Sequence, residues 1–368
     1  MYSISDYLKR SYVFVRNQAF PLHKQLSTLM LYATDLCNSR CKHCLIWDKR
    51  PIIHLPKEKI IEIMHSRCVK KSTVIGLEGG EFLLHPQAFE ILQWFHQHHK
   101  NFDLLSNCLM PQKTIDAVKK YPPKRLFVSL DGTQETYHYM RGKDGYDKVI
   151  NVIENVRDQC PVSVMFTLSP YNSYDDLYHV AEVCERYEID LRVGIYNNIS
   201  YFDTKEKAHE TPVNSKASDE GMINHDRFKK LSAKLEPFKE NMDFLVLYNE
   251  WKRKDLKLPC YSIFDSMVVL PNGDVPICQN LDLKLGNVYS KSLDEIINCR
   301  STHQTQTHHC YNCNGCWINF HRKYDIVLFK NFERLFGKAI SKKVLGDYQW
   351  SNEPSKRNYS RLIKQYTQ

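Results

Sequence analysis

Three cysteines in one short stretch, Cys37, Cys41 and Cys44, are separated by three and two residues. Cysteine thiolates are the usual ligands of iron–sulfur clusters, and a cubane cluster takes four ligands. Three ligands from one loop leave one iron free to bind a substrate or cofactor. Zinc held by these thiols and His43 is the alternative. A structural zinc site usually pairs two cysteine knuckles, and no second knuckle lies nearby in sequence, so the spacing favours an iron–sulfur cluster.

Polar and glycine residues follow several predicted strands. The run Gly79-Gly80-Glu81 is one example. Glycines let a backbone approach a ligand closely, and a carboxylate beside them can hold an ammonium group. Asn107 follows a further strand, and Ser129 and Asp131 close the one after it. Their common position at strand ends indicates one shared site.

The elements that must position these residues alternate between strand and helix from residue 29 to 196. The pattern predicts six strands, at residues 29–34, 73–77, 102–105, 125–130, 162–168 and 189–195. It predicts helices between them, at residues 56–65, 86–98, 112–120, 146–158 and 174–187. Such units form parallel sheets with right-handed crossovers. Six is fewer than the eight of a closed barrel, so we expect an α/β fold with an open, partial (β/α)6 TIM-like barrel and its site at the carboxyl ends of the strands.

Length and composition divide the chain further. Its 368 residues suffice for this barrel and a smaller domain. We expect an N-terminal extension (1–28), the barrel (29–200), a linker with helices (201–255, the helices near 227–239 and 244–254), a small cysteine-rich domain (256–320) and a tail (321–368). No secretory signal or membrane span is visible, so a cytoplasmic protein follows. There its thirteen cysteines are expected to be thiols or metal ligands.

Basic charge gathers at the C-terminal end. The formal net charge is +9, and residues 321–368 hold 11 Lys and Arg against 4 Asp and Glu. The predicted helices there are amphipathic, so this tail is either a solvated face or a contact for an anionic partner, such as a phosphorylated substrate or a membrane surface. Basic strands interleaved with aromatic residues are missing from the sequence, so a nucleic-acid partner is not expected.

The motifs taken together resemble those of the radical S-adenosylmethionine (SAM) enzymes. Cys37, Cys41 and Cys44 match the family's C-x3-C-x2-C signature, which holds the 4Fe–4S cluster that binds SAM. The resemblance implies that Gly79, Gly80 and Glu81 bind the methionine ammonium group. It also implies that Asn107, Ser129, Asp131 and Arg141 line the SAM site, with Ser129 and Arg141 on the methionine carboxylate.

The second cysteine-rich region resembles the SPASM/twitch domain, which binds auxiliary 4Fe–4S clusters. It begins with the G-x4-C element that ends at Cys278. Five candidate ligands are present, Cys260, Cys278, Cys310, Cys313 and Cys316. They suffice for one auxiliary cluster with one thiol to spare. We favour Cys260, Cys278, Cys313 and Cys316 over Cys310, and a zinc site remains the alternative.

Two further positions bear on the reaction. Cys108 follows Asn107 at a strand end, where a thiol could donate a hydrogen atom to a substrate radical, as in peptide epimerases; a plain loop cysteine is the alternative. Gln279 follows Cys278 at the position where sulfatase-maturing relatives carry an acidic base, which argues against that activity.

The resemblance implies an enzyme that cleaves SAM reductively to a 5′-deoxyadenosyl radical and abstracts a substrate hydrogen atom. We expect a peptide substrate that gains a crosslink, thioether or epimer. The alternatives are oxidation or rearrangement of a sugar, cyclitol or lipid-linked metabolite, and a non-catalytic iron–sulfur or zinc scaffold. Expected partners are an electron donor such as flavodoxin or ferredoxin and, for a peptide, a separate leader-binding protein, because no such domain is visible before residue 29.

Overall fold

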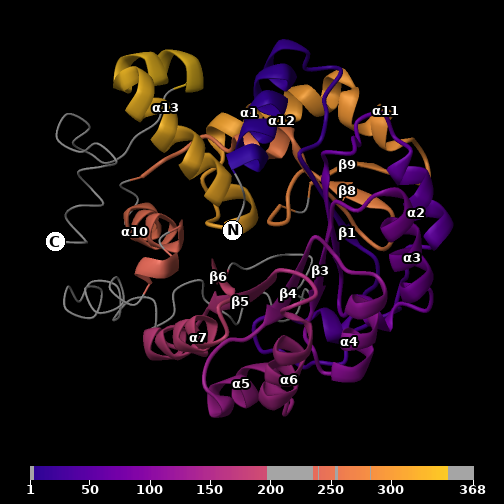
Figure 1. Cartoon of the computed structure of the whole chain (residues 1–368). Helices are drawn as coiled ribbons and strands as arrows, with labels where there is room; N and C mark the ends of the chain where they lie inside the picture. The colour runs from indigo at the N-terminus through magenta and orange to yellow at the C-terminus, as the bar shows by residue number, and fades with distance from the viewer. Residues whose placement is uncertain (1–3, 197–234, 239, 253–255, 282, 347–368) are drawn as a thin grey trace.

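A computed structural model describes residues 4–196, 235–238, 240–252, 256–281 and 283–346. Its centre is a curved sheet of seven parallel strands in the order β6-β5-β4-β3-β2-β1-β7 (Figure 1). Six of them follow one another along the chain, as Thr28–Tyr32, Val74–Glu78, Phe102–Ser106, Arg125–Ser129, Val162–Leu168 and Asp190–Ile195. The predicted partial barrel is therefore confirmed, and each predicted strand is present.

The helices that connect these strands cover the outer side of the sheet (Figure 1). They are α2 (Lys57–Met64), α3 (Ala88–His98), α4 (Pro111–Lys120), α5 (Gln134–Arg141), α6 (Tyr146–Val156) and α7 (Tyr174–Arg186). Each buries one apolar face. In α6, for example, Val149, Val152, Ile153 and Val156 are buried at helical spacing. The inner side of the sheet is thereby left to line a cavity.

A seventh strand joins this sheet from far along the chain. Strand β7 (Ser266–Val269) pairs in parallel with β1, with Leu29 opposite Met267. We did not predict it, because four consecutive buried residues carry no alternating pattern. The cysteine-rich region is thus built directly onto the barrel.

The free edge of β6 is covered by side-chain amides. Asn241 of α10 (Glu240–Lys252) accepts from the Val193 amide and donates to the Leu191 carbonyl. Asn319, at the start of α13 (Asn319–Leu345), donates to the Val193 carbonyl. These amides replace the hydrogen bonds of a missing neighbouring strand and block further strand pairing.

The rest of the cysteine-rich region is small and packs beside β7. It holds the hairpin β8–β9 (Asp274–Pro276 and Lys284–Asn287) and helices α11 (Leu293–Asn298) and α12 (Arg300–Asn312). The expected helix at 244–254 corresponds to α10, whereas the linker and the helix at 227–239 lie almost wholly outside the described residues. The tail forms α13 up to Leu345; the residues beyond Gly346 are not described.

The N-terminal extension forms helix α1 (Ile4–Ala19), which packs against the C-terminal half of the chain. Arg10 donates to the Ser266 hydroxyl at 3.0 Å, forms an ion pair with Asp265, and lies 3.7 Å from the ring centre of Tyr324 on α13. None of the described helices combines the length and the apolar character needed to cross a bilayer.

Candidate active site

The cysteine loop and the Gly-Gly-Glu turn are joined backbone to backbone. The amide of Gly80 donates to the Thr34 carbonyl at 2.7 Å, and the amide of Glu81 donates to the Leu36 carbonyl at 2.8 Å. A Cβ atom on Gly80 would lie 2.3 Å from the Leu36 carbonyl oxygen, which is too close for any side chain. Gly79 has φ of +145° and is equally crowded by Thr34. Both glycines are therefore needed to hold the cysteine loop in place.

Helix α5 holds the same loop from the other side. The amides of Arg40 and Lys42 donate to the carbonyls of Arg141 and Met140 at 3.0 and 2.8 Å. The Ser39 hydroxyl donates to the Arg141 carbonyl at 3.1 Å. The last carbonyls of a helix have no partner within the helix, so they are available for such contacts. The Gly-Gly-Glu turn and helix α5 thus fix the loop that carries the cysteines.

The three cysteines of this loop face one cavity of about 420 Å³ at the carboxyl ends of the strands. Burial raises the pKa of Cys37 to about 12 and raises that of Cys44 further, so a positive metal centre would be needed to hold them as thiolates. Among the described residues no three metal-binding side chains converge on a single ion. A cubane does not require that, because each thiolate binds a different iron. The donor set therefore fits a three-cysteine cluster site.

Glu81 lies on the wall of this cavity with most of its acceptor capacity used. Its carboxylate accepts from the Asn107 amide at 2.7 Å, the Ser106 hydroxyl at 3.1 Å and the Leu83 amide at 3.3 Å. A carboxylate has about four acceptor positions, so about one is left for a ligand ammonium. Burial raises the pKa of Glu81 to about 7, although these donors oppose the shift.

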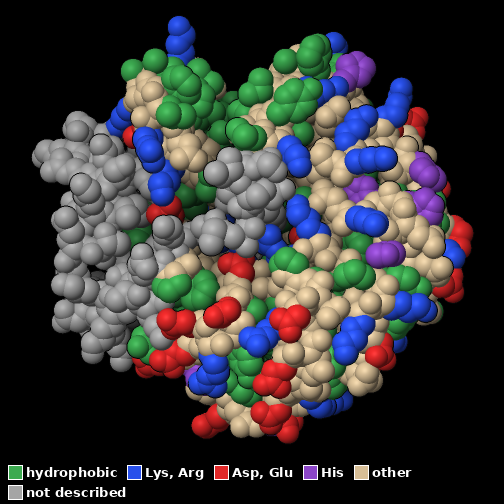
Figure 2. Space-filling view, in the orientation of Figure 1, with side chains coloured by type: hydrophobic (Ala, Val, Ile, Leu, Met, Phe, Trp, Pro, Cys, Tyr) green, Lys and Arg blue, Asp and Glu red, His purple; other side chains and the backbone are tan. Residues whose placement is uncertain are grey.

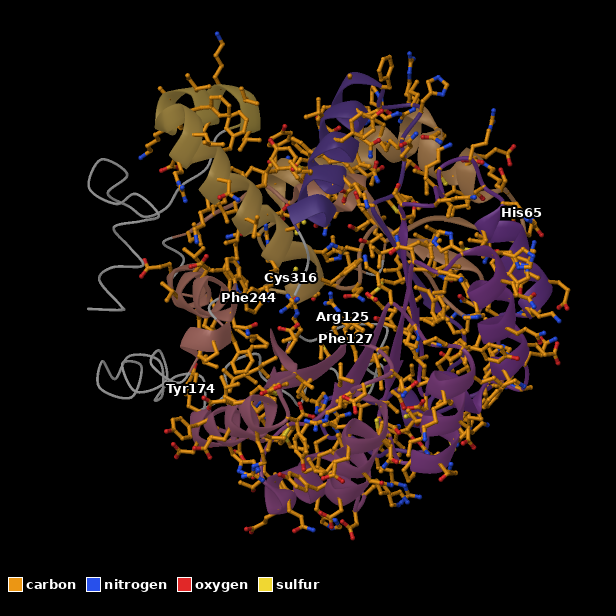
Figure 3. The ribbon with its side chains drawn as sticks, in the orientation of Figure 1. His65, Arg125, Phe127, Tyr174, Phe244 and Cys316 are labelled. Carbon is orange, nitrogen blue, oxygen red and sulfur yellow. The ribbon has the colours of Figure 1, made fainter. Side chains whose placement is uncertain are left out.

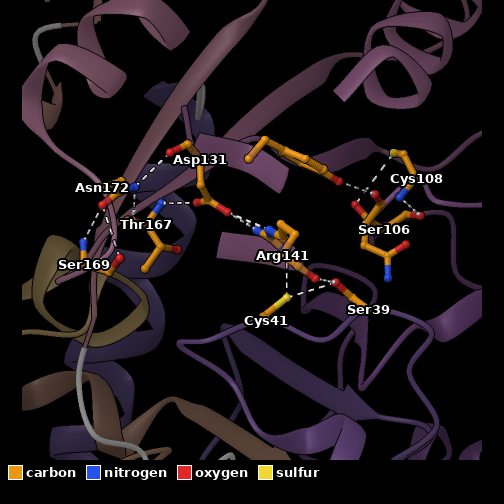
Figure 4. A network of polar contacts seen from close by, with 11 residues as sticks. Ser39, Cys41, Ser106, Cys108, Asp131, Arg141, Thr167, Ser169 and Asn172 are labelled. Carbon is orange, nitrogen blue, oxygen red and sulfur yellow. Dashed lines mark hydrogen bonds and ion pairs between the residues drawn. The ribbon is translucent and has the colours of Figure 1, made fainter. Parts of the chain in front are cut away.

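Arg141 is held beside Cys41 by a buried ion pair (Figure 4). Its Nη1 group lies 3.6 Å from the Cys41 sulfur, and its Nε donates to the Asp131 carboxylate at 2.7 Å. Asp131 is itself fixed, because its other oxygen accepts from the Thr167 amide at 2.8 Å. Arg141 lines the cavity as expected, whereas Asp131 does not and acts through Arg141.

The remaining predicted residues near the cysteines divide into two groups. Asn107 and Ser129 line the cavity, and the side-chain nitrogen Nδ2 of Asn107 lies 3.8 Å from the Cys37 sulfur. Cys108 does not line it. Its side chain is fully buried in the hydrophobic core beside Ser106, with φ of +58° (Figure 4). The hydrogen-donor role of Cys108 stays a prediction, and this placement gives it no support.

Several cavity residues were not predicted to line the site, although Gln279 was noted for its position after Cys278. Glu78 ends β2, hydrogen-bonds to Tyr32 at the end of β1, and has its pKa raised to about 7 by burial. Gln279 donates to the Tyr32 hydroxyl at 2.8 Å and so links the cavity to the second cysteine region. Lys9 and Lys323, from α1 and α13, lie on the open side of the barrel. Only the position of Glu78 at a strand end could have marked it, because the other contacts join distant parts of the chain.

The second cysteine group comes together from three places in the chain, because Cys313 and Cys316 lie in one segment. Cys260, Cys278 and Cys316 are buried, and Cys313 is half-buried. The thiols are close enough to influence one another electrostatically. Cys313 and Cys316 raise the pKa of Cys278, and Cys316 raises that of Cys260. Figure 3 shows Cys316 inside the molecule, next to the start of α13. These are the four favoured ligands.

Cys310 lies apart from those four thiols. Its side chain is fully buried in the hydrophobic core. The groups that act on its thiol are Asp325, the backbone amide of Cys260 and Arg322, and no other thiol is among them. Its carbonyl accepts from the Cys260 amide at 2.9 Å, which is a structural contact. The geometry supports Cys310 as the spare thiol.

A buried arginine stands beside the second group as well. Arg322 is 1% exposed and donates to the carbonyls of Leu258 at 2.9 Å and Cys316 at 3.3 Å. Its Nη1 lies 3.7 Å from the Asp325 carboxylate. Burial alone would lower the pKa of Arg322, but the neighbouring thiols and Asp325 raise it. The arginine therefore stays charged and offsets the negative charge of thiolate ligands.

This fold, with an open three-cysteine site and a separate four-cysteine site, defines an iron–sulfur half-barrel protein. Comparison with known protein families identifies two domains in the chain. Residues 31–184 match the model of the radical SAM superfamily, and residues 260–317 match that of SPASM, an iron–sulfur cluster-binding domain. The chain therefore contains a radical SAM domain and a SPASM domain, and these two domains indicate 4Fe–4S clusters and SAM as its cofactors.

Individual relatives are distant. The antilisterial bacteriocin subtilosin biosynthesis protein AlbA of Bacillus subtilis is 22% identical over 324 residues, which cover 79% of this chain and 68% of AlbA. SuiB of Streptococcus suis bound to SAM has a TM-score of 0.58 at 14% identity and covers 83% of this chain and 74% of SuiB. The protein anSMEcpe with bound SAM and the Cp18Cys peptide has a TM-score of 0.52 at 17% identity, covering 87% and 99%. The structural likeness shows a common fold.

Proposed function

We propose that this protein cleaves SAM reductively and uses the resulting 5′-deoxyadenosyl radical to modify a peptide during natural-product maturation. One observation carries the proposal: the three-cysteine loop is locked to the Gly-Gly-Glu turn at one end of a cavity. AlbA, which acts in bacteriocin biosynthesis, supports the peptide class. So does SuiB, whose structure has also been solved with its precursor peptide SuiA.

The cavity residues fit this chemistry in distinct roles. Cys37, Cys41 and Cys44 would hold the cluster, with Arg141 offsetting its charge. Glu81 has about one acceptor position left for the methionine ammonium, beside the polar groups of Asn107 and Ser129. When bound, SAM and its cluster supply a carbon radical that abstracts hydrogen from unactivated positions.

The deeper part of the cavity favours a side chain over bulk water. Its wall contains apolar residues from successive strands, namely Met30, Leu105, Phe127 and Met165. Apolar lining with a few polar groups is typical of a small-molecule or side-chain site. Excluding water and competing hydrogen donors is what the protein must contribute to radical chemistry.

Cys260, Cys278, Cys313 and Cys316 would hold one auxiliary cluster. Gln279 next to Cys278 donates to the Tyr32 hydroxyl in the cavity, so the two sites are in direct structural contact. This contact supports a role in accepting an electron from the modified substrate or in positioning it. A small electron-transfer protein such as flavodoxin or ferredoxin would deliver the first electron.

The test is anaerobic reconstitution with iron and sulfide, followed by reduction in the presence of SAM. We expect 5′-deoxyadenosine to form, and its absence would sink the proposal. Cys41→Ala is the matched inactive control. Candidate precursor peptides from neighbouring genes are then added, and mass spectrometry measures loss of hydrogen. If a sugar or a lipid-linked substrate is turned over and no peptide is, the proposed peptide substrate is wrong and only the proposed SAM cleavage is supported.

A further inference from the structure

Large hydrophobic side chains exposed on this protein are concentrated on two helices. On α1 and the turn after it they are Leu8, Tyr12, Val15, Phe20 and Leu22, and on the second half of α13 they are Leu335, Phe336, Ile340 and Val344. Elsewhere in the described part of the chain, only Ile52 and four tyrosines, Tyr139, Tyr178, Tyr289 and Tyr311, are comparably exposed. Single exposed tyrosines are ordinary, but grouped aliphatic and phenylalanine side chains mark an interaction site.

The exposed residues of α1 form a stripe. Leu8, Tyr12 and Val15 are spaced by four and three residues and are 66%, 66% and 64% exposed. The opposite face of the helix packs on the protein through Val13 and Asn17, both buried. The stripe is thus the face that the fold leaves uncovered, and α1 has the two-sided character of an interfacial helix.

The second half of α13 shows the same arrangement. Gly337 breaks the helix, with φ of +76°, and nothing lies within 4 Å of the position where its Cβ would be. Leu335 is 71% exposed, and Phe336, Ile340 and Val344 are each at least half exposed. Ser341 and Leu345 are buried on the other side.

Both stripes are flanked mainly by positive charge, although Asp6 lies in α1 and Glu333 directly precedes the second stripe. Beside the α1 stripe the cations are Lys9 and Arg16, because Arg10 is ion-paired with Asp265 and Lys24 is only 2% exposed. Residues 334–346 contain Arg334, Lys338, Lys342 and Lys343 and no acidic residue. Apolar side chains fringed by cations are the composition of helices that lie in the headgroup region of anionic membranes.

The two stripes lie at the same end of the molecule. Figure 2 shows two hydrophobic patches there, over α13 and over α1, with Lys and Arg side chains nearby. One flat surface can touch both at once, whereas a single bound peptide would have to cross the gap between them. Acidic side chains gather at the opposite end of this view, over α5 to α7.

We propose that α1 and the second half of α13 form a peripheral membrane-binding surface for anionic phospholipids, independent of the SAM site. The apolar stripes would enter the boundary between headgroups and acyl chains, and the surrounding lysines and arginines would contact the phosphates. This would hold the enzyme at the membrane with its cavity still accessible.

The test is co-sedimentation of the full chain with vesicles of phosphatidylcholine and phosphatidylglycerol in equal parts, against pure phosphatidylcholine. We expect binding to the anionic vesicles that weakens with salt. The variant Phe336→Ser with Ile340→Ser should lower the partition coefficient at least about tenfold, and so should Tyr12→Ser with Val15→Ser. Lys342→Glu with Lys343→Glu should lower it by a similar factor.

The matched control is Tyr178→Ser, which removes an exposed aromatic from α7, and it should bind like the parent chain. Unchanged circular dichroism shows that each variant is folded. Equal binding to neutral vesicles, no binding at all, or self-association that the α13 variant abolishes would each overturn the proposal. In the last case the surface would be one for a second copy of the chain.

Discussion

The two cysteine sites of this protein differ in how open they are to a ligand. Cys37, Cys41 and Cys44 come from one loop and open onto a cavity. The four favoured auxiliary ligands come from three segments and are mostly buried. Yet each site is backed by a buried Arg–Asp pair, Arg141 with Asp131 and Arg322 with Asp325. The shared pair indicates that both sites carry negative charge. They differ in access, because all three cysteines of the first site line the main cavity, whereas Cys278 of the second lines a separate pocket of about 330 Å³.

The largest difference between the two sites is expected when one cysteine is removed from each. Cys41→Ala should abolish 5′-deoxyadenosine formation and lower the iron content from about eight to about four per chain. Cys316→Ala should lose a similar amount of iron but still release 5′-deoxyadenosine when reduced with SAM. Iron assay and electron paramagnetic resonance follow the clusters, and chromatography follows the nucleoside.

If Cys316→Ala lost the SAM reaction as well, the division between an open and a closed site would be wrong. Cys184→Ala serves as the control for cysteine loss, because Cys184 lies in the hydrophobic core far along the chain from either group.

The next largest effect is expected from the arginine behind the closed site. Arg322→Met leaves Asp325 in the interior without its cation, and breaking such a pair costs about 3–5 kcal/mol. Burial raises the pKa of Asp325 to about 7 although Arg322 lowers it. Without Arg322 the pKa of Asp325 rises further, so protonation should relieve part of that cost at neutral pH and below. Chemical denaturation measures the loss, and a redox titration should show a more negative potential for the auxiliary cluster.

Arg334→Met is the matched control, since Arg334 lies on the same helix but is exposed. A reduction potential unchanged by Arg322→Met would contradict the idea that this arginine offsets cluster charge, even if stability fell.

A smaller effect, dependent on pH, is expected at the open site. Burial raises the pKa of Glu78 to about 7, and Tyr32 and Asp103 are the groups that face it. Because the folded pKa lies above the unfolded one, Glu78 destabilises the fold progressively as pH rises from about 4 to 7. Glu78→Gln should therefore gain about 2–3 kcal/mol relative to the parent between pH 5 and pH 8.

Thermal unfolding at the two pH values measures this difference. Glu58→Gln, an exposed change on α2, should show no such pH-dependent gain. A gain that is equal at pH 5 and pH 8 would mean that Glu78 is not protonated on folding.

Features that depend on neighbouring residues in the chain could be predicted from the sequence, and contacts between distant residues could not. The six barrel strands are apolar runs that end in unusual polar or glycine residues, so their positions and the site edge were predictable. Helix α5 was missed because it is mostly polar, although the Thr133 cap and the left-handed Gly142 that bound it are local signals. The contact of Arg10 with Asp265 joins residues 255 apart and has no local signal.

The smallest predicted effect decides which thiol is spare. Cys310 is fully buried beside Arg322 and Asp325, and the only cysteine group that acts on its thiol is the backbone amide of Cys260. The Cys260 thiol, in contrast, is influenced by the thiol of Cys316. Cys310→Ala should keep the full iron content and cost only about 1 kcal/mol, as expected for losing one buried sulfur. Cys260→Ala, its partner in the same experiment, should lose the auxiliary signal. If the two variants exchanged these outcomes, the cluster would be held by the helix α12 thiol, and the closed site would have to rearrange around it.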